Sequence, residues 1–246
     1  MRKLIGEGWQ AKVFLDEDGR VYKVYPDDFS IERVILEKQI MTLVSQKTNV
    51  PIPTLYEHDH PREIAMSFGG YVTYGENMKR REEGVMERFV SLQQQIHQWQ
   101  VPELPDIALR LRTKYRQSGK FTEEELRKLE EILDSMKTQE NLIHMDFHPD
   151  NILMNENQPT IIDWVMAGKG NPTLDFANTY TILSMFAKRR AQKYLSLLEK
   201  QHLATRTEVL RAVPLFLAQM AVWESEYNHL VNLKQEIAKA IEGGKS

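Results

Sequence analysis

The chain has 246 residues, of which 41% are hydrophobic and 27% charged, and its formal net charge is −3 at neutral pH. This length allows one large domain or two lobes, and the composition is that of a globular chain, which excludes a mini-protein, a disordered chain and a fibrous one. The absence of cysteine excludes disulfides, thiolate metal ligands and a cysteine nucleophile.

The net charges of the segments and the hydropathy pattern argue against a nucleic acid or a membrane as the binding partner. Residues 1–80, 81–170 and 171–246 carry net charges of −1, −5 and +3, so no segment is basic enough to indicate nucleic-acid binding. The N-terminus turns polar too early for a secretory signal, and the apolar stretch 213–223 is too short to span a bilayer. We therefore expect a cytoplasmic protein with neither a membrane nor a nucleic acid as its partner.

The N-terminal part of the sequence predicts a small β-rich lobe with one helix. Residues 12–15 and 20–25 read as two strands around a turn that ends at Gly19. Ser30 can cap a helix that ends before Pro51, since apolar residues recur there at helical spacing. Two further strands are expected at 54–56 and 63–67, and Gly69-Gly70 marks the lobe boundary. The first lobe thus covers residues 1–70.

Residues 71–246 predict a larger, mainly helical lobe. The periodic segments are 82–99, 107–117 and 123–136. Short strand-like pieces follow at 142–144, 151–154 and 160–163, and helices return from Leu174, with Pro214 as a kink or start point. The expected fold class is α+β.

The densest polar cluster is His-Met-Asp-Phe-His-Pro-Asp-Asn at residues 144–151, followed twelve residues later by Asp163 at the end of an apolar strand. A rigid loop between strands would hold the side chains of Asp146, Asn151 and Asp163 so that they point into one common space. Carboxylate and amide oxygens suit Mg²⁺, which typically takes one or two carboxylates together with substrate phosphates. A carboxylate that is free of metal could accept the proton of a hydroxyl during phosphoryl transfer.

The pattern His-x-Asp-x-x-x-x-Asn followed by a strand ending in Asp resembles the aminoglycoside phosphotransferase and choline kinase-like family, relatives of the protein kinases. The resemblance implies a two-lobed protein kinase-like fold. It also implies that Asp146 is the catalytic base, with Asn151 and Asp163 binding Mg²⁺. His144 would be a scaffold residue.

Independent segments agree with the resemblance. Residues 5–13 look like a kinase glycine-rich loop, in which the backbone at Gly6 and Gly8 can approach phosphates. Lys23 matches the strand lysine that contacts the nucleotide phosphates, and Glu37, on the helix face expected to pack on the sheet, matches its partner. Two more segments carry the resemblance. Residues 66–70, with Met66 and Phe68, resemble the adenine-binding hinge. Residues 170–177 resemble the segment after the metal loop, in which the Asp, here Asp175, is chiefly structural.

The sequence also departs from the protein kinases. His148 stands where many of them have a phosphate-contacting lysine, Trp164 and Val165 replace the Phe and Gly of Asp-Phe-Gly, and Ala-Pro-Glu is missing. We therefore expect an ATP- or GTP-dependent, Mg²⁺-requiring enzyme that phosphorylates a hydroxyl of a small molecule such as an aminoglycoside, sugar or amino alcohol, with Asp146 and His148 at the reaction centre. The alternatives are a non-catalytic nucleotide-binding scaffold of the same fold and a protein kinase.

Overall fold

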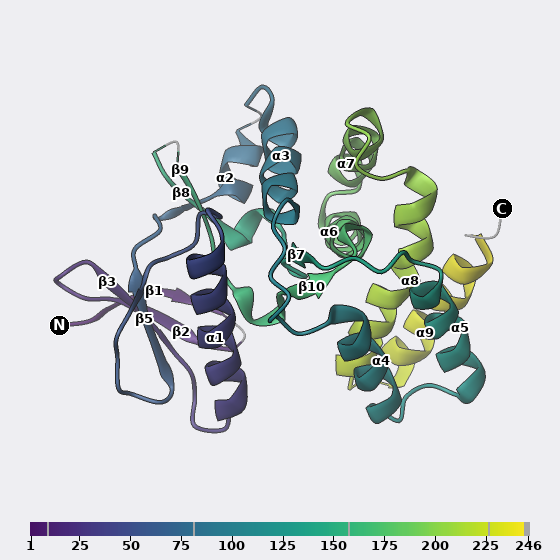
Figure 1. Cartoon of the computed structure of the whole chain (residues 1–246), viewed down its shortest axis with the longest axis horizontal. Helices are drawn as coiled ribbons and strands as arrows, with labels where there is room; N and C mark the ends of the chain where they lie inside the picture. Colours follow the sequence, from purple (N-terminus) through teal and green to yellow (C-terminus); the bar gives the residue numbers. More distant parts are fainter. Residues whose placement is uncertain (9, 81, 157, 226, 244–246) are drawn as a thin grey trace. The chain divides into compact units, whose positions relative to one another are not determined.

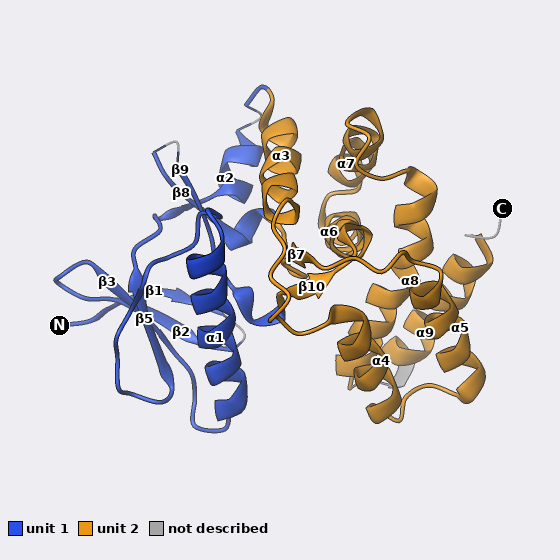
Figure 2. Cartoon of the chain, in the orientation of Figure 1, with its two compact units in different colours: residues 1–83, 149–166 blue, residues 84–148, 167–246 orange. Residues whose placement is uncertain are grey.

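The computed structural model describes residues 1–8, 10–80, 82–156, 158–225 and 227–243. The chain forms two compact units, coloured separately in Figure 2. Unit 1 contains residues 1–83 and 149–166, and unit 2 contains residues 84–148 and 167–246. A small antiparallel sheet dominates unit 1 and helices dominate unit 2, which confirms the predicted α+β class.

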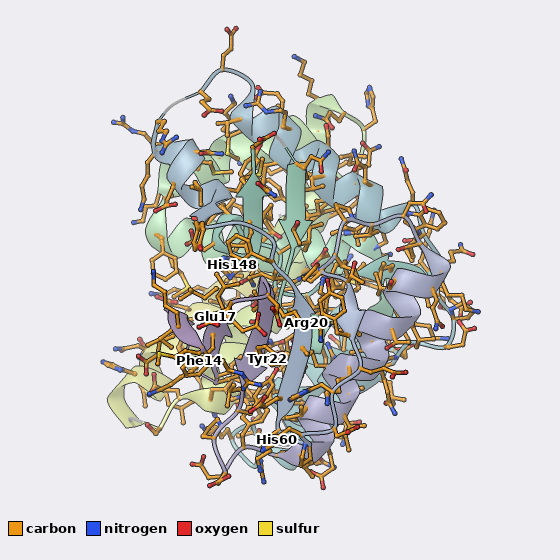
Figure 3. The ribbon with its side chains drawn as sticks, turned by 90° about the vertical axis from the view of Figure 1, so that its left-hand side faces the viewer. Phe14, Glu17, Arg20, Tyr22, His60 and His148 are labelled. Atoms are coloured by element: carbon orange, nitrogen blue, oxygen red, sulfur yellow. The ribbon has the colours of Figure 1, made fainter. Side chains whose placement is uncertain are left out.

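Unit 1 is built on a five-stranded antiparallel sheet of order β1-β2-β3-β5-β4. Its strands are β1 (Lys3–Glu7), β2 (Lys12–Leu15), β3 (Arg20–Val24), β4 (Leu55–Tyr56) and β5 (Glu63–Ser67). Because side chains alternate along a strand, Val21 and Lys23 share one face of β3 while Tyr22 lies on the other. Tyr22 is paired with Phe14 of β2, and both residues are labelled in Figure 3.

Helix α1 (Ile31–Lys47) belongs to unit 1 and contacts strand β5 of this sheet (Figure 1). Ser30 caps it by accepting a hydrogen bond from the Arg33 N–H, as its residue type predicts. The buried face of α1 carries Val34, Glu37, Ile40, Met41 and Val44. The charged side chain of Glu37 therefore lies within an otherwise apolar face of α1.

A second sheet, of order β6-β8-β9, brings residues 149–166 into unit 1. It consists of β6 (Val72–Thr73), β8 (Ile152–Asn155) and β9 (Gln158–Ile161), with α2 (Tyr74–Lys79) following β6. Gly70, just before β6, has φ 125°, and a Cβ there would lie 2.3 Å from the Met154 carbonyl oxygen. The chain can pass this closely over β8 only because residue 70 has no side chain.

Unit 2 combines one small sheet with seven described helices. Strands β7 (Asn141–Ile143) and β10 (Gly168–Gly170) pair antiparallel. The helices are α3 (Val85–His97), α4 (Ile107–Gln117), α5 (Glu123–Asp134), α6 (Pro172–Phe186), α7 (Lys188–Lys200), α8 (Arg206–Trp223) and α9 (Tyr227–Gly243). Helix α6 packs against α7 and α8, and α8 packs against α9. Pro214 lies inside α8. Among the described residues, no helix is both long and apolar enough to cross a membrane.

The close approach at Gly70 yields a stability prediction. The variant Gly70→Ala places a methyl group against the β8 backbone at a φ that L residues rarely adopt, so its free energy of unfolding should fall by at least about 3 kcal/mol. Gly19→Ala is the matched control, since Gly19 also has positive φ (78°) but no atom within 4 Å of the point where the new methyl group would lie. It should lose only about 1 kcal/mol. Urea denaturation measures both, and equal losses would contradict the steric argument.

Candidate active site

Lys23 lies at the centre of a charge cluster in unit 1. Its Nζ donates to Glu37 Oε1 at 2.8 Å and to Asp163 Oδ1 at 2.9 Å. The exposed fractions of the three side chains are 16% for Lys23, 2% for Glu37 and 38% for Asp163. Strand β3, helix α1 and the segment after β9 thus each contribute one member. The pairing of Lys23 with Glu37, which helical spacing predicts over Glu32, is present in this geometry.

The two carboxylates decide the charge state of Lys23. Burial by itself lowers the pKa of this ammonium group, but the negative charges of Glu37 and Asp163 outweigh burial and raise the pKa well above its ordinary value of 10.5. Lys23 therefore remains a cation at any physiological pH. A fixed cation of this kind can attract the phosphates of a nucleotide.

The β8–β9 hairpin brings Asn151 and Asp163 to the same end of a strand pair. Ile152 pairs with Ile161, and the Ile162 N–H donates to the Asn151 carbonyl oxygen at 2.9 Å. Asp163 then adopts a left-handed backbone conformation, with φ 64°. Trp164, which is fully buried, follows it and donates from Nε1 to the Ile161 carbonyl oxygen. These anchors on both sides hold Asp163 in a conformation that costs a non-glycine residue about 1–2 kcal/mol.

The other residues predicted to bind nucleotide also belong to unit 1. Gly6 lies in β1 opposite Val13, and the Gly8 N–H donates to the Ala11 carbonyl oxygen at 2.9 Å. Met66 pairs with Val21 and so shares the sheet face of Lys23. Phe68 follows β5, and its ring packs against Tyr71 with the ring centroids 4.5 Å apart.

Asp146 and His148 belong to unit 2, in the loop that follows β7. Their side chains are 32% and 23% exposed, and His148 Nε2 lies 3.8 Å from Asp146 Oδ1. Figure 3 labels His148. An imidazole at this distance can interact electrostatically with the carboxylate, although the separation is too long for a hydrogen bond.

The backbone before Asp146 is held by the buried carboxylate of Asp175, near the start of α6. Asp175 accepts hydrogen bonds from the backbone N–H groups of His144 (3.3 Å) and Met145 (2.7 Å). It also accepts from Nε2 of His97 (2.8 Å) and Nε2 of Gln93 (3.2 Å). Burial by itself raises the pKa of Asp175, but the hydrogen bond and charge of His97 outweigh this and lower it.

These contacts explain an unusual backbone conformation. Met145 has φ 63°, in the left-handed region, and is fully buried. Its N–H binds Asp175, and its carbonyl oxygen accepts from Asn178 Nδ2 at 2.6 Å. Thr179 Oγ1 donates to the Phe147 carbonyl oxygen at 2.8 Å. Helix α6 thus determines the path of the chain on both sides of Asp146.

Sequence reasoning missed several members of these networks. Tyr25 donates its hydroxyl to Glu37 Oε2, and Gln93 and His97 bind Asp175. The position of Tyr25, two residues after Lys23, is a signal that could have been used, since i and i+2 on a strand share a face. Gln93 and His97 are one helical turn apart, which placed both on one face of the predicted helix 82–99.

The side chains proposed to bind a metal ion offer a small number of oxygen ligands, which are hard donors. Within the residues that the structure describes, no group of three or more His, Asp or Glu side chains is arranged to hold a metal ion. Asn151 and Asp163 offer one amide and one carboxylate at the end of the hairpin. This set fits Mg²⁺, which retains waters and completes its octahedron with phosphate oxygens, and it does not fit a closed structural zinc site.

Comparisons with known proteins agree with this geometry. A sequence model of the "Phosphotransferase enzyme family" matches residues 2–208, whereas comparison with curated protein sequences gives no match. The ADP-bound aminoglycoside phosphotransferase APH(2'')-Ib has 17% identity and a TM-score of 0.67, over 98% of this chain and 92% of that chain. Choline kinase LicA from Streptococcus pneumoniae has 14% identity and a TM-score of 0.69, over 99% and 94%. At these identities the structures support the fold alone, and the predicted kinase-like fold is confirmed.

The Asp175 network yields a prediction that depends on pH. Asp175→Asn turns one acceptor atom into a donor that faces other donors, so the free energy of unfolding at pH 7 should fall by about 2–4 kcal/mol. Because the folded-state pKa of Asp175 lies below the ordinary 3.8, the stability from its ionisation is present above pH 3.8 and is lost as pH falls further. Wild type should therefore lose more stability than the variant on acidification below about pH 4.

Urea denaturation at several pH values tests this, with Asp27→Asn as the control because the Asp27 side chain is fully exposed. The argument is wrong if Asp175→Asn and wild type show the same pH dependence.

Proposed function

Because the chain belongs to the phosphotransferase enzyme family, we propose that it transfers the γ-phosphate of ATP to a hydroxyl group of a small molecule. The observation that carries the proposal is the cluster in which Lys23 is held between Glu37 and Asp163. A lysine paired with a helix carboxylate beside an aspartate that can bind metal is the arrangement that protein kinases use for phosphoryl transfer.

In unit 1, the proposed roles follow from charge and donor type. Lys23 and the backbone at Gly6 and Gly8 orient the nucleotide phosphates, while the hinge with Met66 and Phe68 receives the base, which makes ATP the expected donor and leaves GTP as an alternative. Asn151 and Asp163 hold Mg²⁺. When bound, the ion neutralises charge on the phosphate oxygens.

In unit 2, Asp146 is the proposed base. Its carboxylate orients the acceptor hydroxyl and takes the proton as the hydroxyl oxygen bonds to the γ-phosphorus. The bond from that phosphorus to the β–γ bridging oxygen breaks in the same transfer, and ADP leaves. The Met145 N–H donates to the buried Asp175, and the Met145 carbonyl oxygen accepts from Asn178 Nδ2. These two hydrogen bonds fix the backbone directly before Asp146, so that the Asp146 carboxylate needs little reorganisation during the reaction. His148, at 3.8 Å, adds positive charge near Asp146 when it is protonated. The reaction uses no covalent enzyme intermediate.

The charge of the C-terminal segment favours an acceptor with few positive charges. Residues 171–246 contain 10 basic and 7 acidic residues. Three of the acidic side chains accept hydrogen bonds from backbone N–H groups of this chain. Asp175 binds the loop before Asp146, Glu208 caps α8 and Glu199 binds the Arg206 N–H. A polycationic aminoglycoside is bound best by a surplus of carboxylates, whereas this segment carries a surplus of cations. A sugar or an amino alcohol is therefore the preferred acceptor class.

The function is tested by ATP consumption with Mg²⁺ across hydroxyl-containing metabolites and aminoglycosides. Asp163→Ala removes a metal ligand and should lower turnover at least about 100-fold, and EDTA should do the same to wild type. Asp27→Ala is a control, since this exposed aspartate belongs to neither network. Near-normal turnover in a folded Asp163→Ala variant would refute the metal assignment.

Asp146→Asn separates the base from the nucleotide site. It should lower kcat at least about 100-fold with an unchanged Kd for ATP, because unit 1 alone supplies the proposed nucleotide ligands. Single-turnover phosphorylation and calorimetric titration measure the two quantities. If ATP stabilises wild type thermally but no acceptor stimulates turnover, the scaffold alternative replaces the proposed enzyme.

A further inference from the structure

Glu37 uses both of its carboxylate oxygens. Oε1 accepts from Lys23 Nζ at 2.8 Å, and Oε2 accepts from the hydroxyl of Tyr25. Lys23 and Tyr25 are two residues apart, and the Tyr25 N–H donates to the Arg62 carbonyl oxygen, so the extended pairing continues past the end of β3. Both side chains therefore reach Glu37 from the same face of one chain segment. A carboxylate held at both oxygens cannot turn without losing a partner.

The ring of Tyr25 is itself immobilised. It is 3% exposed and stacks on Phe29, with ring centroids 4.8 Å apart. The Arg33 guanidinium lies 4.9 Å from the Phe29 centroid, and its Nη2 donates to Gln10 Oε1 at 3.5 Å. A continuous series of contacts therefore runs from Glu37 through Tyr25, Phe29 and Arg33 to Gln10. Ordered stacks of this kind pre-organise the group at their end.

The hydroxyl of Tyr25 is a permanent donor. Burial raises the pKa of Tyr25 far above its ordinary value of 10.0, so the group stays protonated. Its hydrogen bond to Glu37 is charge-assisted, which makes it stronger than a bond between neutral groups. The ring of Tyr22, which lies on the opposite sheet face, has its hydroxyl near Asp16 instead.

We propose that Tyr25 is a positioning residue for the phosphate-binding lysine. The inference rests on the proposed function, in which Asp163 would bind Mg²⁺ and Glu37 would be the carboxylate that keeps Lys23 in place. Tyr25 fixes Glu37, and Glu37 fixes Lys23. The hydroxyl of Tyr25 thereby contributes to the binding of nucleotide phosphates without touching them.

The test uses Tyr25→Phe, which removes one oxygen and keeps the ring and its stack. Calorimetric titration should show about 10-fold weaker binding of ATP with Mg²⁺, with adenosine affinity unchanged, since adenosine lacks phosphates. Tyr22→Phe is the matched control and should leave both affinities unchanged. In a Glu37→Gln background, Tyr25→Phe should add little further loss, because the effect passes through the Glu37 carboxylate.

The outcomes separate this inference from the function on which it rests. If wild type binds no ATP, the proposed function fails and the inference fails with it. If wild type binds ATP and Tyr25→Phe has the same Kd, only the inference is refuted. Equal losses for ATP and adenosine, or full additivity with Glu37→Gln, would make Tyr25 a general structural residue and would also refute it.

Discussion

Lys23 carries a full positive charge on a side chain that is only 16% exposed, and two carboxylates make this possible. A charge with so little access to water is costly unless it is paired and hydrogen-bonded. The need to pair this charge orients α1, because Glu37 must point toward Lys23 of β3 from the apolar face of the helix. It also orients the segment after β9, where Asp163 accepts the second hydrogen bond at a left-handed backbone position. One cation thus links three parts of unit 1.

Unit 2 solves a comparable problem with a buried anion. Asp175 has no exposed surface, and four donors from α3 and the loop after β7 surround it. Two of these donors are backbone N–H groups, so the carboxylate fixes the chain itself as well as side chains. The left-handed Met145 is stable for that reason. In both units, a strained residue at or beside a predicted functional aspartate is held by contacts that are distant in sequence.

Local patterns account for much of the structure. The hairpin of β2 and β3, the Ser30 cap and helix α4 over Ile107–Gln117 follow from alternation, capping and helical spacing. The choice of Glu37 over Glu32 needed only the face of one helix. Element ends were less accurate, since the helix predicted over 82–99 spans Val85–His97. Helix ends depend on which backbone groups find partners, which periodicity does not reveal.

Contacts between distant segments required more than periodicity. Lys23 and Asp163 are 140 residues apart, and only the family pattern of spaced residues pointed to both. No such pattern pointed to Tyr25, whose role depends on the side on which α1 lies. Contacts between distant segments also explain why unit 1 does not end at the lobe boundary expected at Gly70. It continues to Glu83 and includes residues 149–166. This extension follows from the pairing of β6 with β8, and a two-residue strand such as β6 is too short to show any alternation. Sequence periodicity therefore reveals which face a side chain occupies, while tertiary pairing decides what that side chain meets.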